Sequence, residues 1–373
     1  MEKGITFIVT KDCQLACKYC YLVGKNSQER MPWEIAKLAI DYILSNEKDF
    51  PEQSVAWDFI GGEPFLEIGL IDKICDYIKT EMFRLNHHWF NSFRFHFSTN
   101  GINYDTQKVQ DFIKKNRQHL SIGITIDGTR EKHDLNRIWK TKDGFSPKPK
   151  DEKGSYDDVV RNIPLWREQF PFDGTKVTIS SADVKYIKDS VLHLYSLGIH
   201  EVNINVVFED VWKEGDDKRF EEQLIQLADA IIDGEYYTDY TCSFFSEHLG
   251  KPMDKKLQNN NWCGAGRMLA VDAAGNFYPC TRFAQYSLRD KKAWIIGNVN
   301  DGIDKNKLRP FLTLDRCTQS NQECIDCEVA EGCAWCQGEN YDAAETPTAF
   351  QRSTAICKMH KARVRANNYY WNK

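Results

Sequence analysis

The feature that most constrains this sequence is a run of three cysteines near the N-terminus, Cys13-Gln-Leu-Ala-Cys17-Lys-Tyr-Cys20. The run follows an apolar stretch, residues 5–9, that is typical of a buried strand. Cysteine thiolates hold iron–sulfur clusters, usually in sets of four. Three thiolates on one loop can hold three irons of a 4Fe–4S cluster and leave the fourth iron for a reactant. A zinc loop and three ordinary buried thiols are the alternatives that the spacing alone leaves open.

Composition and charge exclude several classes of protein. The chain has 373 residues, a net charge of −5 and a pI of about 6.0, so no basic surface indicates nucleic-acid binding. The first apolar stretch follows the N-terminus without a signal peptide, and no apolar run approaches the ~20 residues that span a membrane. Thirteen cysteines without an export signal favour metal binding over disulfides, and hence a reduced, cytoplasmic metalloprotein.

The cysteine run, with Tyr19 before its last cysteine, resembles the signature of the radical SAM enzymes. The resemblance implies a 4Fe–4S cluster held by Cys13, Cys17 and Cys20, whose open iron binds the amino and carboxylate groups of S-adenosylmethionine. In that family, the reduced cluster cleaves S-adenosylmethionine to methionine and a 5′-deoxyadenosyl radical, which abstracts a hydrogen atom from the substrate. The protein supplies binding, orientation and shielding.

Strand-like and helix-like segments alternate through about residue 215. Strands are expected at residues 5–10, 55–60, 93–98, 120–126, 176–181 and 201–208, and helices after Pro32 and at residues 68–83, 105–115, 156–169, 187–197 and 219–232. Six strand–helix repeats predict an α/β fold with a parallel sheet and helical crossovers. Because periodicity does not separate an open sheet from a barrel, the choice rests on the resemblance, which implies a partial (β/α)6 TIM-type barrel over residues 1–215.

Residues 216–250 are expected to form a helical linker. From Cys242 onward the chain is loop-rich, shows little helical period and holds nine of the thirteen cysteines. Residues 251–373 are therefore expected to form a second domain that metal ligation stabilises more than a core does.

The segment Gly61-Gly62-Glu63-Pro64 comes directly after the second expected strand. Glycines at a strand end let the backbone approach a ligand closely, and a carboxylate there can accept hydrogen bonds from an ammonium group. In parallel α/β folds, ligands bind at the carboxyl ends of the strands. The resemblance implies that this segment holds the amino group of S-adenosylmethionine.

Further positions after the third and fourth strands match the same family. A hydroxyl residue at Thr125 is implied for the ribose, and Arg137 for the methionine carboxylate, which a guanidinium can bind through both oxygens. A surface salt bridge is the alternative role for Arg137. Tyr19 is expected to lie against the adenine, or simply to pack in the core. The remaining matches are Thr99, Asn100 and Asp127.

The C-terminal cysteines resemble the SPASM domain, which extends radical SAM enzymes that modify peptides and proteins. Cys263 is followed by Gly275 and, after four more residues, by Cys280; then come Cys324, Cys327, Cys333, Cys336 and Cys357. The resemblance implies two auxiliary 4Fe–4S clusters. The outer cluster would take Cys324, Cys327, Cys333 and Cys357, and the inner one Cys263, Cys280 and Cys336.

Two departures from the SPASM pattern matter. The last spacer of the four-cysteine group is usually three residues, whereas Ala334 and Trp335 make it two here. Seven cysteines also fall one short of the eight that two complete clusters need. Cys242 or Cys317 could supply the missing ligand of the inner cluster; alternatively, that cluster keeps an open iron to which a substrate thiolate could bind. A zinc site with four thiolate ligands is the alternative for the Cys324–Cys336 group.

The resemblance names a class of chemistry and leaves the substrate open. Anaerobic sulfatase-maturating enzymes carry an aspartate, the proposed base, directly after the cysteine of Gly-x4-Cys; here that position is Thr281, which cannot act as a carboxylate base. The favoured hypothesis is a maturase of ribosomally made peptides that forms a thioether or carbon–carbon crosslink. Sulfatase-type protein oxidation, a metabolite substrate and a non-catalytic iron–sulfur or zinc scaffold are the alternatives.

A peptide maturase implies partners as well as a substrate. A flavodoxin or ferredoxin would reduce the first cluster. Because Cys13 leaves no room for an N-terminal leader-binding domain, the leader is expected to bind the barrel, the SPASM domain or a separate protein. The catalytic base is not identifiable. Asp183, Glu209 and Asp210 lie near strand ends, but each is expected to be simply solvated.

Overall fold

The computed structural model describes residues 2–25, 27–142, 147–253 and 263–373. Its first half contains six strands in the predicted places: β1 (Glu2–Thr10), β2 (Ser54–Gly61), β3 (Phe93–Thr99), β4 (Leu120–Ile124), β5 (Thr175–Ile179) and β6 (Glu201–Val206). β1 to β4 pair in parallel, and β5 pairs in parallel with β6. The prediction of an α/β partial barrel is confirmed.

Strands β4 and β5 are connected by hydrogen bonds of one side chain, and not by a ladder of backbone hydrogen bonds. The two strands belong to separate sheets, and Thr175 joins them. Its hydroxyl donates to the Ile124 carbonyl over 2.7 Å and accepts from the Ile126 N–H over 3.2 Å. The barrel is therefore continuous around its wall although its hydrogen-bond ladder is interrupted.

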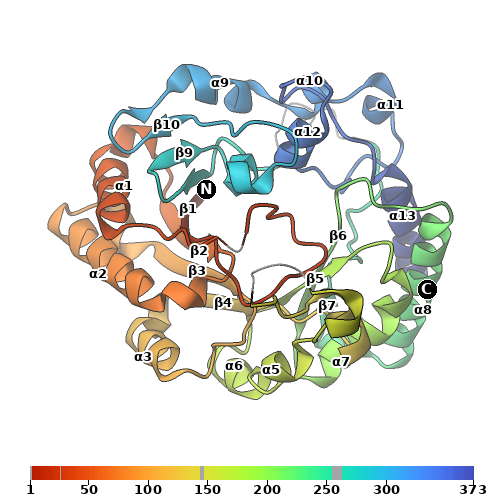
Figure 1. The fold of residues 1–373 in the computed structure, drawn as a ribbon. Coiled ribbons are helices and arrows are strands. Elements are labelled where there is room, and N and C mark those ends of the chain that lie inside the picture. The colour runs from red at the N-terminus through yellow and green to blue at the C-terminus, as the bar shows by residue number, and fades with distance from the viewer. Residues whose placement is uncertain (1, 26, 143–146, 254–262) are drawn as a thin grey trace.

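Helices cover the outside of the strands (Figure 1). They are α1 (Trp33–Ser45), α2 (Ile68–Arg84), α3 (Gln107–Asn116), α4 (Arg130–Asn136), α5 (Tyr156–Val160), α6 (Ile163–Gln169), α7 (Ile187–Ser196) and α8 (Asp216–Asp233). The single helix expected over residues 156–169 is two helices. Pro164 lies in the first turn of α6, where its missing N–H costs nothing, and it could not continue α5.

The two faces of the strands differ because successive side chains point to opposite sides. On β2 and β3, Trp57, Phe59, Phe95 and Phe97 are fully buried on the helix side, where Phe97 packs against Phe112 of α3. On the opposite, inward face, Asp58 Oδ1 and His96 Nδ1 lie at hydrogen-bond distance, 2.6 Å apart. The core thus lies between strands and helices, and the inner face of the barrel is polar.

The C-terminal part joins the same sheet. β8 (Leu269–Val271) pairs in parallel with β1, and β9 (Asn276–Tyr278), β10 (Gly297–Asn298) and β11 (Gly302–Ile303) extend it in antiparallel fashion. β7 (Thr241–Cys242) extends β6 on the other sheet. The remaining helices are α9 (Lys305–Thr313), α10 (Arg316–Gln319), α11 (Gln322–Ile325), α12 (Gln337–Ala343) and α13 (Cys357–Trp371).

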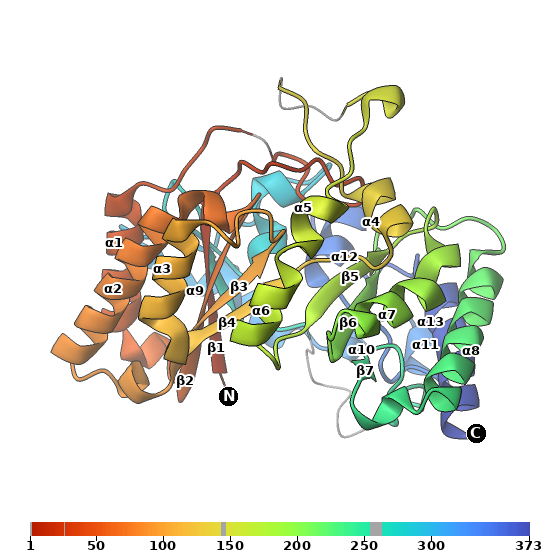
Figure 2. The same ribbon diagram turned by 90° about the horizontal axis from the view of Figure 1, so that it is seen from below.

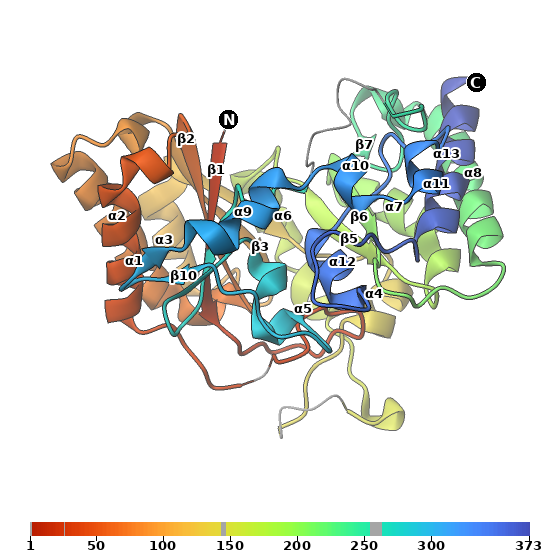
Figure 3. The ribbon, with the colours of Figure 1, turned by 90° about the horizontal axis from the view of Figure 1, so that it is seen from above.

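The helix α13 contradicts the expectation of little helical period beyond Cys242. It lies along α8 (Figures 2 and 3), where Arg365 pairs with Glu221 and Tyr369 donates to Asp229. Its buried face is made partly of small and polar side chains, including Ala362, Ala366 and His360, so the apolar pattern is weak. Among the described residues, none of the helices has the length and apolar content that crossing a membrane requires.

Candidate metal and cofactor sites

The loop with the three N-terminal cysteines is held by the glycine segment that follows β2. The Gly62 N–H donates to the Thr10 carbonyl over 3.0 Å, and the Glu63 N–H donates to the Asp12 carbonyl over 2.8 Å. A Cβ on Gly62 would lie 2.2 Å from the Asp12 oxygen. The glycines are therefore required for close approach to the cysteine loop, whereas the sequence suggested a close approach to a ligand.

Glu63 connects the ends of β2 and β3 beside this loop. Its carboxylate is 1% exposed and accepts from the Thr99 hydroxyl over 2.6 Å and from the Asn100 N–H over 2.7 Å. Burial raises the pKa of Glu63, and these hydrogen bonds together with Arg137 oppose the rise. The Asn100 amide nitrogen lies 3.9 Å from Cys13 Sγ. Glu63, Thr99 and Asn100, all predicted site residues, thus meet at the cysteine loop.

Tyr19, Asp127 and Arg137 form a second group at the same loop. The Tyr19 hydroxyl donates to Asp127, and Arg137 Nη1 donates to the Tyr19 oxygen over 3.0 Å. Burial opposes ionisation of Asp127, but Lys132, Arg137 and His133 together hold its pKa below the usual range. Arg137 is 7% exposed, and its Nε is buried without a hydrogen-bond partner. A buried, unsatisfied guanidinium donor is what a site for a carboxylate would leave in the absence of that carboxylate.

Two other predicted residues complete this end of the barrel. The Thr125 N–H donates to the Thr99 carbonyl over 2.9 Å, which ties the end of β4 to the end of β3. Pro64 is buried and begins the short 3-10 helix that follows the glycine segment. The predicted cofactor residues therefore gather at the carboxyl ends of β1 to β4.

The thiols of Cys13 and Cys17 in this loop are shielded from solvent. Burial raises the pKa of Cys13 to about 12, with Cys17 and Glu63 adding to the rise. Burial also raises the pKa of Cys17, against the opposing charge of Arg137. A metal that binds here must displace protons, and the positive charge of Arg137 favours that exchange.

The C-terminal cysteines gather in two groups. Cys280 is buried, and its pKa is raised by burial and by the neighbouring thiols of Cys263 and Cys336. The backbone N–H groups of Gln337 and Glu339 donate to the sulfurs of Cys263 and Cys336 over 3.4 and 3.5 Å. The three cysteines expected at the inner site therefore lie together.

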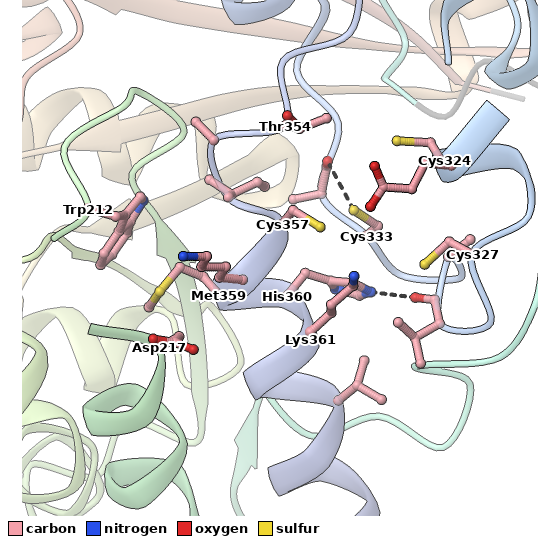
Figure 4. A pocket seen from close by; sticks show the side chains of 18 of the residues that line it. Trp212, Asp217, Cys324, Cys327, Cys333, Thr354, Cys357, Met359, His360 and Lys361 are labelled. Carbon is pink, nitrogen blue, oxygen red and sulfur yellow. Dashed lines mark hydrogen bonds between the residues drawn. The ribbon is translucent and has the colours of Figure 1, made fainter. Parts of the chain in front are cut away.

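The four cysteines expected at the outer site line a cavity of about 1180 Å³ (Figure 4). They are Cys324, Cys327, Cys333 and Cys357. Burial raises the pKa values of Cys324 and Cys333, and Arg352 opposes both rises.

The spacing of the thiols bears on the zinc alternative. A tetrahedral zinc ion with Zn–S bonds of about 2.3 Å brings its sulfurs to about 3.8 Å from one another. In the described part of the chain, the group whose three ligand atoms all lie within 4.8 Å is Glu47, His87 and His88, which contains no cysteine. None of the cysteine groups in the described residues has three ligand atoms within that distance of one another.

Hydrogen bonding argues against metal binding at Glu47, His87 and His88 themselves. The Trp89 N–H donates to His87 Nδ1 over 3.2 Å, so the ring proton of neutral His87 sits on Nε2, the atom that faces Glu47. A nitrogen that carries a proton cannot ligate a metal. Only Glu47 and His88 remain as ligands, and two are too few for a structural site.

Cys242 and Cys317 were both candidates for the missing inner ligand. Cys242 lies in β7, where burial raises its pKa to about 11, and its charged neighbour is Arg363 of α13. Cys317 lies in α10, beside Arg316.

The sequence analysis did not single out three residues that lie near the cysteine groups: Tyr21, Arg282 and Lys176. Tyr21, just beyond Cys20, stacks under Arg282 with 4.5 Å from Cζ to the ring centre, and shares a hydrogen bond with the Thr281 side chain. Lys176 of β5 alternates with the buried Thr175 and Val177, which places it on the inward face; its side chain is exposed there, and partial desolvation followed by the charge of Arg282 lowers its pKa. The alternation of apolar and polar residues over 175–179 is the sequence signal that could have placed Lys176 on the inward face.

The expectation that three acidic residues are simply solvated was wrong for two of them. Asp183 is fully buried, 3.2 Å from Lys132 Nζ, and accepts from the Asn136 amide over 2.9 Å. Glu209 pairs with Arg282 at 2.9 Å. Asp210 is exposed, as expected.

The comparisons with known proteins agree with this geometry. A family described as a 4Fe-4S single cluster domain matches residues 4–143, which contain β1 to β4 and the cysteine loop. The chain is 27% identical over 313 residues to an uncharacterised protein of Methanocaldococcus jannaschii, covering 82% of this chain and 91% of the relative. It is 30% identical over 161 residues to a cysteine-type anaerobic sulfatase-maturating enzyme of Clostridium novyi, covering 42% of this chain and 38% of the relative.

Two solved structures share the fold. One is anSMEcpe with bound AdoMet and a peptide, with a TM-score of 0.67 at 16% identity over 100% of both chains. The other is SuiB of Streptococcus suis bound to its precursor peptide SuiA, with a TM-score of 0.58 at 15% identity over 94% of this chain and 75% of that one. The cysteine motif, the fold and these relatives agree with the resemblance to the radical SAM enzymes.

Proposed function

We propose that this enzyme is a peptide maturase that reductively cleaves S-adenosylmethionine and abstracts a hydrogen atom from a ribosomally made peptide. The product would carry a thioether between a cysteine sulfur and an α or β carbon, or a carbon–carbon crosslink. Two proteins of the same fold hold a peptide, which supports a peptide substrate here. The observation that carries the proposal is the unpartnered Arg137 Nε beside the cysteine loop.

The residues at the carboxyl ends of β1 to β4 fit the cofactors. Cys13, Cys17 and Cys20 would hold a 4Fe–4S cluster, which supplies the electron that cleaves S-adenosylmethionine to its radical. Glu63 Oε2 accepts one hydrogen bond from Asn100 and has further capacity for an ammonium group. Arg137 offers its Nε to a carboxylate. Thr125, at the end of β4, would offer its hydroxyl to the ribose.

The two C-terminal groups fit auxiliary clusters. The outer four cysteines form a complete set, and the inner three leave one position for another ligand. Lys176, on the inward face of the barrel, and Arg282 both lie near Cys336 of the inner group, where a peptide would meet the S-adenosylmethionine site. These side chains would orient the peptide and hold its charged groups.

The surroundings of Cys280 favour crosslinking over sulfatase-type oxidation. Thr281 occupies the position at which the sulfatase-maturating enzymes carry an aspartate, and its side chain forms a hydrogen bond with Tyr21. Two nearby carboxylates, Glu209 and Glu339, both pair with Arg282. Glu339 also pairs with Arg289, so both carboxylates are held by guanidinium groups and neither is free to take the place of that aspartate. The relative from Clostridium novyi keeps formylglycine formation as the second candidate function.

The proposed activity requires partners. A flavodoxin or ferredoxin would reduce the first cluster in the cytoplasm, and a separate protein could present the leader of the peptide. Anaerobic incubation with each candidate donor, S-adenosylmethionine and a cysteine-containing peptide would identify the donor through the yield of 5′-deoxyadenosine.

Mass spectrometry tests the proposal directly. The chain would be co-expressed anaerobically with a short cysteine-containing peptide encoded beside its gene, and the peptide treated with a thiol-labelling reagent. Loss of two hydrogens per site together with loss of labelling indicates a thioether. Loss of two hydrogens with every cysteine still labelled indicates a carbon–carbon crosslink.

The control is Cys17→Ala, which should abolish both the mass change and 5′-deoxyadenosine production. An unmodified peptide from a protein that still makes 5′-deoxyadenosine would overturn the peptide-crosslinking proposal. A sulfatase-derived peptide that then gained an aldehyde would establish the second candidate in its place.

A further inference from the structure

One cation is aimed at a sulfur of the outer cysteine group. Arg352 Nη2 donates to Cys333 Sγ over 3.0 Å, and Nη1 donates to the Ser320 hydroxyl over 3.1 Å. The guanidinium also stacks on Trp335, with 4.7 Å from Cζ to the ring centre. Within the described residues, none of these contacts is to a carboxylate, so its charge is left to face the thiols.

The short spacer in the cysteine pattern supplies the platform for this arginine. Cys333 belongs to the outer group and Cys336 to the inner one, with Ala334 and Trp335 between them. Trp335 lies beside a second guanidinium, Arg316, whose Cζ is 5.7 Å from the ring centre. The indole therefore contacts two cations, and its stacking on Arg352 supports the orientation that directs Nη2 at Cys333.

Hydrogen bonds to cysteine sulfurs and local charge set the reduction potential of an iron–sulfur group. A cluster with four thiolates carries net negative charge, and reduction adds one more. A cation at hydrogen-bond distance stabilises the reduced form more than the oxidised form, because Coulomb attraction grows with the charge of the cluster. A charge-assisted N–H···S bond also takes electron density from the sulfur.

We propose that Arg352 is a positioning residue that raises the reduction potential of the group held by Cys324, Cys327, Cys333 and Cys357. This inference rests on the proposed function, which assigns a 4Fe–4S cluster to those cysteines. The contact from Arg352 therefore makes the outer cluster easier to reduce than its four cysteine ligands alone would make it. The four cysteines line a surface cavity, where such a group can exchange an electron with another protein.

Redox titration followed by electron paramagnetic resonance tests this inference on the full-length protein, reconstituted anaerobically with iron and sulfide. The signal of the outer group is defined as the one missing from a Cys324→Ser, Cys327→Ser double variant. Arg352→Gln removes both the charge and the donor. At a fixed ambient potential, we expect the reduced-to-oxidised ratio of that signal to fall about tenfold, equivalent to about 59 mV for one electron.

Two further variants separate the hydrogen bond from charge and from folding. Arg352→Lys keeps the positive charge, but its single amino group cannot donate to Ser320 and Cys333 in the two-pronged geometry of a guanidinium. This variant should give an intermediate reduction potential. Lys361→Gln removes a cation that lines the same cavity and should leave the potential unchanged. Iron content is measured for every variant, so a protein that failed to assemble is recognised, and Arg352→Lys then carries the test.

Three results would overturn the inference. The potential of Arg352→Gln could equal that of the wild type, or Lys361→Gln could shift it as much as Arg352→Gln does. The double cysteine variant could also hold as much iron as the wild type. That last result would remove the outer cluster from the proposed function, while the first two would leave the proposed function intact.

Discussion

Arg137 combines burial, positive charge and an unsatisfied donor at the end of the barrel. Arg130, at the start of the helix α4 that Arg137 follows, is exposed and pairs with Asp157. If Arg137 holds a carboxylate, Arg137→Lys removes the two-pronged contact and should weaken S-adenosylmethionine binding about 10- to 100-fold, the loss of a charged hydrogen bond worth about 1.5–3 kcal/mol. Equilibrium dialysis on the iron-loaded protein measures the affinity.

Arg130→Lys is the matched control and should bind as the wild type does, with equal iron content in all three proteins. Equal affinity of Arg137→Lys and the wild type would assign Arg137 to the structural pairing with Tyr19 and Asp127 alone.

His133 links the cofactor end of the barrel to pH. Burial, reinforced by Arg137, lowers its pKa to about 3 although Asp127 opposes the shift. In the unfolded chain, a histidine takes up a proton below a pKa of about 6.5. The stability that His133 contributes is therefore complete above about pH 6.5 and is lost as the pH falls towards 3, by about 2 kcal/mol at pH 5.

Urea unfolding of the iron-free protein at pH 7.5 and pH 5.0 checks this expectation, with His133→Asn for comparison. The wild type should lose about 2 kcal/mol more than His133→Asn between the two values. The same loss in both proteins would mean that other groups carry the acid sensitivity.

The strands of the barrel were predictable because their signals are local. β1 to β6 are apolar or alternating segments, and the cofactor residues follow the ends of β1 to β4 in the sequence. Parallel strands then bring their carboxyl ends to one edge. Glu63, Thr99 and Asn100 could be assigned together for this reason, although their mutual hydrogen bonds could not.

The contacts between distant segments were not predictable from the sequence. Tyr21 and Arg282 are far apart in the chain and meet only because β8 pairs with β1. Arg352 gives no local sign of its bond to Cys333, which depends on how a loop returns before α13. The helix α13 itself has a buried face that only its packing on α8 defines.

At the level of elements, the cysteine loop depends on the strand end that supports it. Gly62→Ala would place a Cβ 2.2 Å from the Asp12 oxygen, a backbone atom that cannot yield without moving Cys13. The variant should lose the iron held by the N-terminal cysteines and about 1–3 kcal/mol of stability. Iron and sulfide analysis with thermal unfolding measures both.

Gly69→Ala provides the control, because nothing lies within 4 Å of a Cβ at that position in α2. It should keep its iron and gain about 0.5–1 kcal/mol, since alanine is the better helix former. Full iron content in Gly62→Ala would show that the loop does not need this close approach.

At the level of the whole molecule, the C-terminal part is anchored at two places and depends on its cysteines between them. β8 continues the barrel sheet at one end, and α13 packs on α8 at the other. Between them, residues 316–357 form only the short helices α10, α11 and α12. Helices of four to seven residues are not stable alone, so these must rely on packing and on metal ligation.

Iron removal should therefore loosen one region and spare another. After anaerobic chelation, we expect amide hydrogens of residues 316–357 to exchange at least tenfold faster, about 1.4 kcal/mol of local stability, because ligand binding to the folded segment is part of its folding energy. β2, β3 and α13 should keep their protection, since buried apolar side chains hold them. The Cys324→Ser, Cys327→Ser double variant should reproduce the pattern without chelator. A uniform loss of protection across the barrel would mean that the metal sites hold the whole fold together, and unchanged exchange in residues 316–357 would mean that packing alone supports them.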